Sequence, residues 1–355
     1  MAATCADRRD RLRRVLADTD VSGLVVTDLI NVRYLSGFTG SNAALWVSSD
    51  DPAADRISTD GRYLTQVAEQ SPGLPLIEAR DVWRGLIDSV DAPAIGFEKH
   101  VVSVAQYEAA GTDRLVGVDP LVERLREVKD DGEVALIAQA CAVGDAALAA
   151  LIDRDAIRPG RTERQVARDL EWAMFERGGD AVAFETIVAA GPNSAVPHHR
   201  PTDAVLATGD FVKIDFGSVV GGYHSDMTRT FVLGRPAAWQ SEIYAIVAQA
   251  QRAGCDALVP GVLTRDVDAA ARTVIDDAGY GEMYVHGLGH GVGLQIHEAP
   301  GIGKLGAGSL RAGSVVTVEP GIYLPGRGGV RIEDTLVVGA NARSLTATRR
   351  DLVVL

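Results

Sequence analysis

The feature that most constrains the fold of this chain is a predicted β-hairpin at residues 211–234, FVKIDFGSVVGGYHSDMTRTFVLG. Two β-rich runs flank Gly221-Gly222, and a two-residue Gly-Gly loop between such runs is a strong hairpin signal. If the two glycines form the loop, Val220 pairs with Tyr223. The register of the remaining pairs then follows by counting outward.

This register brings two aspartates together. It puts Asp215 opposite Thr228, and Asp226 shares their face as the diagonal neighbour of Asp215. Diagonal positions lie ~7–8 Å apart, which is close enough for two carboxylates to share a metal centre. Aspartates in strands are usually edge or surface groups, but Asp215 stands between apolar residues that should be buried. A buried carboxylate needs a cation or a shifted pKa, so the pair is a candidate metal site.

A second acidic region, SVVTVEPGIYLPGRGGVRIEDTLVV, spans residues 314–338. Glu319 ends an apolar strand, and Glu333 lies in the strand that returns. Alternation along the returning strand puts Arg331, Glu333 and Thr335 on one face. Because the strand ends in an apolar run, this charged face indicates a cleft rather than bulk solvent.

Histidines concentrate in the same part of the chain, with six of the seven between positions 198 and 297. Three of them, His286, His290 and His297, lie in HGLGHGVGLQIHEAP. The HxxxH spacing is that of helical zinc sites, but the intervening Gly-Leu-Gly is a poor helix former and the glutamate after the first histidine is missing. The run is not a dinucleotide-binding GxGxxG either. The glycines instead permit close backbone approach around a site.

Coarse patterning divides the chain in two. Residues 1–125 alternate between strands and helices and predict an α/β domain around one sheet, with strands at 21–28, 44–49 and 55–60 and a helix at 62–70. The first 20 residues predict an exposed amphipathic helix with solvated arginines. Residues 126–355 predict an α+β domain. A long helical segment breaks near Asp130, and further helices are expected at 162–178, 238–254 and 264–278.

Composition narrows the class of protein. The 355 residues carry a net charge of −13, which argues against nucleic acid as a partner. Three scattered cysteines form no disulfide framework. No apolar run approaches the ~18 residues of a membrane span, and the N-terminus lacks the apolar stretch of a signal peptide. We therefore expect a cytoplasmic protein that does not engage a membrane.

The two acidic regions and the histidine segment together resemble the pita-bread metallopeptidases, the group of methionine aminopeptidase, aminopeptidase P and prolidase. The resemblance covers most of residues 125–355, including GPNSAVPHHRP and IHEAP. The N-terminal YLSGFTGSNAALWV and STDGRY resemble the creatinase-like domain of the proline-specific branch. The implied fold is an α/β creatinase-like domain at 1–125 and an α+β pita-bread catalytic domain at 126–355. The positions that match the five metal ligands of the family are Asp215, Asp226, His290, Glu319 and Glu333.

The resemblance implies two divalent ions and an Xaa-Pro exopeptidase. Asp226 and Glu333 would bridge the ions, Asp215 would chelate one, and His290 with Glu319 would hold the other. Four carboxylates and two divalent ions also balance in charge, before a bridging hydroxide attacks the amide bond that precedes proline. Manganese is the expected metal, with cobalt or zinc as alternatives. The expected substrates are peptides with proline at the second position, and relatives suggest a homodimer.

The resemblance also implies roles around the metals. His297 would stabilise the tetrahedral intermediate, His198 would contact the substrate near the scissile bond, and Glu319 would shuttle a proton. His286 and Arg331 are expected in the substrate pocket, whereas His199 and His224 receive no role. The choice between dipeptidase and longer-peptide aminopeptidase stays open. Two alternatives share the fold: a metal-independent creatinase and a non-catalytic binding protein. Both branches typically lack the ligand set.

Overall fold

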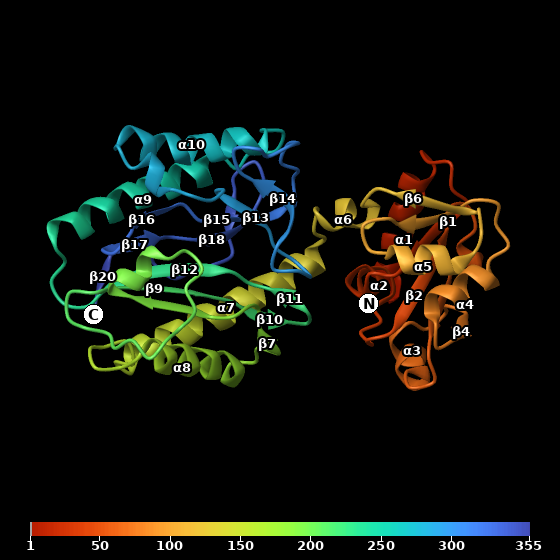
Figure 1. Cartoon of the computed structure of the whole chain (residues 1–355), viewed down its shortest axis with the longest axis horizontal. Coiled ribbons are helices and arrows are strands. Elements are labelled where there is room, and N and C mark those ends of the chain that lie inside the picture. Colours follow the sequence, from red (N-terminus) through yellow and green to blue (C-terminus); the bar gives the residue numbers. More distant parts are fainter. Residues whose placement is uncertain (1) are drawn as a thin grey trace. The chain divides into compact units, whose positions relative to one another are not determined.

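The computed structural model describes residues 2–355 and divides the chain into two compact units, between Arg126 and Glu127. The boundary expected from the sequence lies one residue earlier. Each unit has its own sheets and helices (Figure 1).

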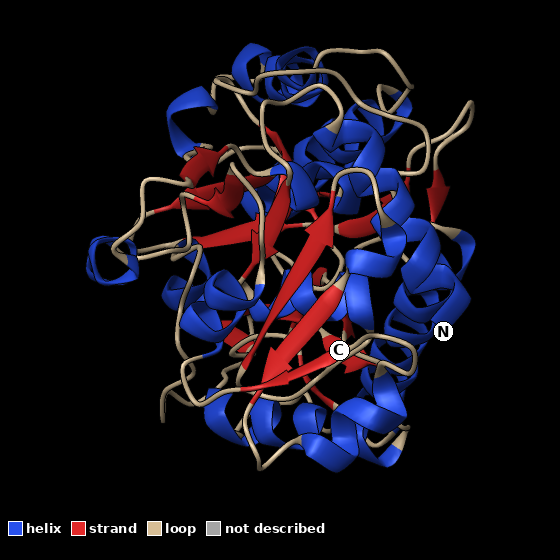
Figure 2. Ribbon diagram, turned by 90° about the vertical axis from the view of Figure 1, so that its right-hand side faces the viewer, coloured by secondary structure: helices blue, strands red, loops and turns tan. Residues whose placement is uncertain are grey.

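The N-terminal unit is built on one six-stranded sheet, as predicted, in the order β4-β3-β2-β1-β5-β6. Its central strands are buried along their whole length and mostly apolar, which suits a sheet covered on both faces. Figure 2 shows the strands in red among the blue helices. The strands are β1 (Gly23–Val26), β2 (Ala43–Ser48), β3 (Arg56–Thr59), β4 (Leu76–Glu78), β5 (Ile95–Glu98) and β6 (Leu115–Val118).

The helices of this unit begin and end at recognisable signals. Asp28 caps α2 by accepting from the Ile30 amide, and Gly37 ends α2 in the left-handed conformation. One expectation was wrong: two arginines of α1 are buried rather than solvated, because Arg13 pairs with the buried Asp55. The helices are α1 (Ala2–Leu16), α2 (Leu29–Ser36), η1 (Pro52–Ala54), α3 (Leu64–Gln70), α4 (Val82–Ser89), α5 (Val104–Ala110) and α6 (Leu121–Arg126).

The C-terminal unit begins with α7, which starts where the sequence predicted a break. Asp130 accepts from the Glu133 amide while the Glu133 side chain accepts from the Asp130 amide, a complete capping box. By length and composition α7 could cross a membrane, but its inner face is buried, as in the core helix of a globular unit. The helices of this unit are α7 (Asp131–Asp153), α8 (Glu163–Glu176), η2 (Gly191–Ala195), α9 (Ala238–Asp256), α10 (Thr264–Asp277) and η3 (Gly281–Met283).

The predicted hairpin is present with the predicted register. Val220 pairs with Tyr223, and Thr228 lies opposite Asp215. The hairpin belongs to two sheets, β20-β12-β9-β8 and β11-β10-β7. The strands are β7 (Ala181–Val182), β8 (Ile187–Ala190), β9 (Phe211–Phe216), β10 (Ser218–Val220), β11 (Tyr223–His224), β12 (Met227–Val232) and β20 (Val353–Val354).

A second β region follows α10. It comprises a five-stranded sheet, β14-β13-β15-β18-β19, and the two-stranded β16-β17. The strands are β13 (Gly289–Gly291), β14 (Glu298–Ile302), β15 (Val315–Val318), β16 (Gly321–Leu324), β17 (Gly328–Arg331), β18 (Asp334–Val337) and β19 (Arg343–Ser344). One expectation was wrong here: the strand predicted to carry Glu333 is divided, because β17 pairs with β16 while β18 pairs with β15.

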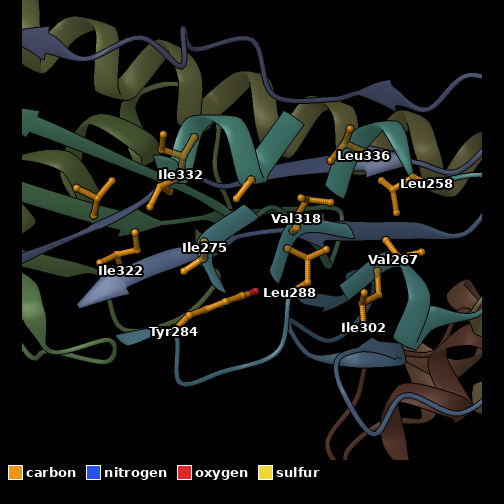
Figure 3. Close-up of a cluster of buried hydrophobic side chains, with 14 of the residues drawn as sticks. Leu258, Val267, Ile275, Tyr284, Leu288, Ile302, Val318, Ile322, Ile332 and Leu336 are labelled. Atoms are coloured by element: carbon orange, nitrogen blue, oxygen red, sulfur yellow. The ribbon is translucent and has the colours of Figure 1, made fainter. Parts of the chain in front are cut away.

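The C-terminal unit therefore has two αβ halves, each with a core of its own. One core joins α7 and α8 to β8, β9 and β12. The other joins α9 and α10 to the second β region, with side chains such as Ile275, Leu288 and Val318 pointing toward one another (Figure 3). In Figure 1 the strands of this unit lie between α9–α10 and α7–α8. The acidic segments of both halves thus face a shared interior.

Candidate metal centre

One cavity of about 260 Å³ in the C-terminal unit collects the acidic residues of both halves. One possible donor atom each of Asp226, His290 and Glu333 lies within 4.8 Å of the others. His290 Nε2 lies 3.5 Å from Glu319 Oε1 and 3.6 Å from Asp226 Oδ2. The wall contains all five positions matched to metal ligands, Asp215, Asp226, His290, Glu319 and Glu333.

The first half supplies two carboxylates through its hairpin. Asp215 lies on β9, and Asp226 directly precedes β12, so the register places both at one end of the strand pair. Thr228, opposite Asp215, donates from Oγ1 to Glu333 Oε2 at 2.7 Å. This bond joins the hairpin to the second half. Glu333 itself lies in the gap between β17 and β18, which frees its backbone amide to bond the Thr228 carbonyl at 3.1 Å.

The second half supplies His290 through a strand that requires glycine. A Cβ on Gly289 would lie 2.1 Å from the Thr317 oxygen, and a Cβ on Gly291 would lie 2.1 Å from the Ala299 oxygen. The close backbone approach expected from the glycines is therefore confirmed. His290 Nδ1 hydrogen bonds the Gly291 carbonyl at 3.1 Å. Because a carbonyl only accepts, Nδ1 carries the proton and Nε2 presents its lone pair to the carboxylates.

The electrostatics of the cavity favour a cation. Burial and the neighbouring Glu333 carboxylate raise the pKa of Asp226 well above its usual range, and burial with the neighbouring Glu319 does the same for Glu333. Burial raises the pKa of Glu319 to about 8 and lowers the pKa of His290 to about 4, so the imidazole is neutral as a ligand must be.

Asp215 carries an independent sign of a missing partner. Its Oδ1 atom is buried without a hydrogen-bond partner, although its Oδ2 accepts from Arg331 Nη2. A native carboxylate oxygen is rarely left so, because desolvation without a partner costs free energy. Oxygen donors with one imidazole are a set that divalent manganese, cobalt or zinc accepts. The residues present fit divalent metal ions.

Two predicted substrate groups lie beside the cavity rather than in its wall. Arg331 is buried, and its guanidinium donates to Asp215, to Thr228 Oγ1 at 3.0 Å and to Tyr323 Oη at 2.8 Å. His286 Nε2 hydrogen bonds Tyr323 Oη at 2.8 Å. A role for Arg331 and His286 in binding substrate stays a prediction. The buried Tyr323 that joins them was not anticipated from the sequence, because a tyrosine in the apolar run GIYL reads as core.

The remaining wall of the cavity comes from three segments. His198 and His297 line it as expected, and the His297 ring packs edge-on against His290 at 4.4 Å between centroids. His199 also lines the wall but donates to the buried Glu163, and His224 bonds the Gly293 carbonyl instead. Sequence reasoning missed five wall residues whose positions depend on tertiary folding: Phe184, Glu185, Ile187, Arg200 and Ile296.

Comparisons with known proteins agree with this geometry. The profile of metallopeptidase family M24 matches residues 135–340, and that of the creatinase/prolidase N-terminal domain matches residues 8–128. The "Uncharacterized peptidase YqhT" of Bacillus subtilis is 38% identical over 98% of this chain and 99% of its own length. The Xaa-Pro dipeptidase of Pyrococcus furiosus is 34% identical over 98% of this chain and 99% of its own length.

Solved structures resemble the whole chain. An Xaa-Pro dipeptidase from Bacillus anthracis has a TM-score of 0.94 at 35% identity, covering 99% of this chain and 100% of that one. An X-Pro aminopeptidase from Thermotoga maritima has a TM-score of 0.88 at 33% identity, covering 98% and 99%. The predicted fold class, a creatinase-like domain followed by a pita-bread domain, is confirmed. The chain belongs to metallopeptidase family M24, a family that uses divalent metal ions, and carries the creatinase/prolidase N-terminal domain.

Proposed function

We propose that this M24 metallopeptidase is an Xaa-Pro dipeptidase. The observation that carries the proposal is the convergence of four carboxylates and one imidazole on a cavity of about 260 Å³, a volume below that of pockets for drug-sized ligands. A cavity of this volume accommodates a dipeptide. The relatives named as Xaa-Pro dipeptidases support the same substrate class.

The wall of the cavity offers chemistry for both ends of an Xaa-Pro dipeptide. Phe184, Ile187 and Ile296 supply apolar surface for a pyrrolidine ring, which has no amide hydrogen to satisfy. Among the described residues that line the cavity, Arg200 carries the single guanidinium. Arg200 Nε lies 3.0 Å from Glu185 Oε2, and both side chains are exposed. Arg200 can therefore exchange this partner for the carboxylate of the substrate.

We assign the metal-holding role to Asp215, Asp226, His290, Glu319 and Glu333. When bound there, two divalent ions would polarise the scissile carbonyl and lower the pKa of a water molecule to near neutrality. The protein's own part is to hold the donors in place: Thr228 fixes Glu333, and the Gly291 carbonyl fixes the tautomer of His290.

Three side chains are proposed to act on the substrate. His297 packs against His290 and faces the cavity, where its imidazole can stabilise charge that develops on the carbonyl oxygen. His198 lies on the wall and is open to solvent on one side. Partial desolvation and the nearby Arg331 lower its pKa, so it is neutral at pH 7 and can accept a proton near the scissile bond. Glu319 lines the same cavity beside His290, where its carboxylate can take up and release a proton.

The two alternatives with the same fold have less support. A creatinase-like enzyme or a non-catalytic binding protein would not need five donor residues in one cavity, and here all five are present. We further propose that the native metal is manganese, that the protein is a homodimer and that it is cytoplasmic. Metal analysis, light scattering and cell fractionation test these three points separately.

The test of function is hydrolysis of Ala-Pro and of Ala-Pro-Ala by metal-stripped protein resupplied with manganese, cobalt or zinc. We expect metal-dependent cleavage with a clear preference for Ala-Pro. The variant Arg200→Gln should lose this preference mainly through a higher KM for Ala-Pro, whereas the control Arg158→Gln, exposed outside the cavity wall, should not. Equal cleavage of both peptides by the wild type would contradict the dipeptidase assignment. Cleavage of neither peptide would contradict the assignment of Xaa-Pro peptidase activity.

A further inference from the structure

The loop at residues 190–202 carries His198 into the cavity wall, but within the described part of the chain no side chain or backbone group hydrogen bonds the His198 ring. The side chain is exposed. Its direction therefore depends on how the backbone of the loop is fixed. Two buried ionisable residues outside the metal-ligand set fix that backbone.

The first is Glu163, in the first turn of α8, whose carboxylate is fully buried. Its Oε1 accepts from the Ala190 amide at 2.8 Å and from Asn193 Nδ2 at 2.9 Å. Its Oε2 accepts from His199 Nε2 at 2.8 Å and from Thr202, through the amide at 2.9 Å and through Oγ1 at 2.7 Å. One carboxylate thus holds both ends of the loop.

The second is Lys213 on β9, which is also fully buried. Its Nζ donates to the Val196 carbonyl at 2.6 Å and to the Pro197 carbonyl at 3.2 Å, the two residues directly before His198. Lys213 shares the face of β9 with Asp215, so the strand that presents one carboxylate also holds the loop. Its Nζ lies 5.1 Å from the centroid of the Tyr323 ring, which adds a cation–π contact.

Neither residue is needed to fill space. Burying a lysine and a glutamate costs free energy, and apolar side chains of similar volume pack as well or better. The two groups are not paired with each other; both direct their hydrogen bonds to loop 190–202. Bonds from a single side chain to several positions of one segment restrict the conformations of that segment, and hydrogen bonds to ionised groups contribute about 1.5–3 kcal/mol each.

We propose that Glu163 and Lys213 are positioning residues that together hold loop 190–202 so that His198 faces the acidic cavity. The inference rests on the proposed function for the role of His198 in catalysis. It assigns no substrate contact to either residue. The proposal also assigns a role to His199, because its imidazole connects Glu163 to the loop directly beside His198.

The experiment compares Lys213→Met, which keeps the length of the side chain but cannot donate, with Lys213→Arg and with the surface control Lys99→Met. With Ala-Pro and saturating manganese, Lys213→Met should lower kcat about 10- to 100-fold, the loss expected when a catalytic group is misplaced, while KM and bound metal stay near wild type. Lys213→Arg should recover part of the loss. Lys99→Met should behave as wild type.

A double-mutant cycle with His198→Ala separates positioning from general damage. If Lys213 acts through His198, adding Lys213→Met to His198→Ala should lower kcat no further. Full additivity of the two losses, or wild-type kcat in Lys213→Met, would overturn the inference. Glu163→Gln, which keeps the shape but replaces one acceptor oxygen by an NH2 donor that faces other donors, should give the same non-additive pattern.

Hydrogen exchange of loop 190–202 provides a readout that does not depend on activity. We expect amides of the loop to exchange about tenfold faster in Lys213→Met and Glu163→Gln than in the wild type, while β9 and β12 exchange unchanged. Unchanged exchange of the loop in both variants would overturn the inference even if the wild type cleaves Ala-Pro. If the wild type cleaves no peptide, the proposed function fails, and faster exchange of the loop still supports its anchoring.

Discussion

Replacing Glu333 by glutamine should stabilise the metal-free protein at high pH. The donor atoms of Glu333 and Asp226 lie within 4.8 Å, where two charges repel by roughly 3 kcal/mol at an effective dielectric constant near 20. Protonation relieves part of this, because both pKa values are raised in the folded state. At pH 8 we therefore expect a gain on the order of 2 kcal/mol, or about 4–8 °C in Tm for a unit of this size.

The sign of the effect depends on pH and on metal. A carboxyl whose pKa is raised on folding stabilises the folded state while it is protonated, and that stability is lost as pH rises from the unfolded pKa toward the folded one. The advantage of Glu333→Gln should therefore vanish at pH 5 and grow toward pH 8. With manganese the order should reverse, because a ligand at 100 times its Kd stabilises the wild type by about 2.7 kcal/mol and the variant has lost a donor.

Differential scanning calorimetry measures the Tm of both proteins at pH 5 and at pH 8, once with a chelator and once with manganese. The exposed Glu282→Gln serves as the control and should follow the wild type throughout. If Glu333→Gln is less stable than the wild type in chelator at pH 8, the carboxylate is a structural group and the reasoning is refuted.

Further predictions follow from the same geometry. Asp226→Ala should reduce Ala-Pro hydrolysis by roughly 10³-fold or more, as the loss of a catalytic group does in other enzymes. Activity near that of the wild type would contradict the assignment of Asp226 as a ligand shared by two metal ions. Because burial raises the pKa of Glu319 to about 8, metal affinity measured by calorimetry should increase from pH 6 to pH 8 with release of protons; a flat profile would contradict this. Gly291→Ala, whose Cβ would lie 2.1 Å from a backbone oxygen, should cost about 1–3 kcal/mol and impair metal binding, whereas Gly301→Ala, with open space around it, should not.

Much of the candidate site was predictable because its residues follow local rules. The Gly221-Gly222 turn fixed the register that places Asp215 opposite Thr228. The glycines around His290 predicted a close approach of backbone segments, which the structure confirms. Both predictions rest on hydrogen-bond geometry within a few residues, which sequence patterns report directly.

The rest depended on contacts between distant segments. Strict alternation predicted one strand through Glu333, whereas the chain changes partners from β16 to β15 at that residue. No local pattern reports such a change of partner. From the sequence, Lys213 looks like an ordinary strand residue and Glu163 like an acidic residue at the start of a helix. Only the folded structure shows that the Val196 carbonyl accepts a hydrogen bond from Lys213. Their partners lie 16 to 39 residues away in sequence.

The division of donors between the two halves has an energetic consequence. Asp215 and Asp226 come from the first half, whereas His290 and Glu319 come from the second, and Glu333 is held to the first half by Thr228. The neighbouring Arg229 on β12 is fully buried and donates to Asp334 on β18 at 2.7 Å, a second link between the two halves. In the metal-free state, repulsion among the carboxylates opposes the association of the two halves. Bound cations attract the carboxylates of both halves and would favour that association. Metal binding should therefore raise the stability of both halves together, in one cooperative transition of residues 127–355, rather than stabilise either half alone.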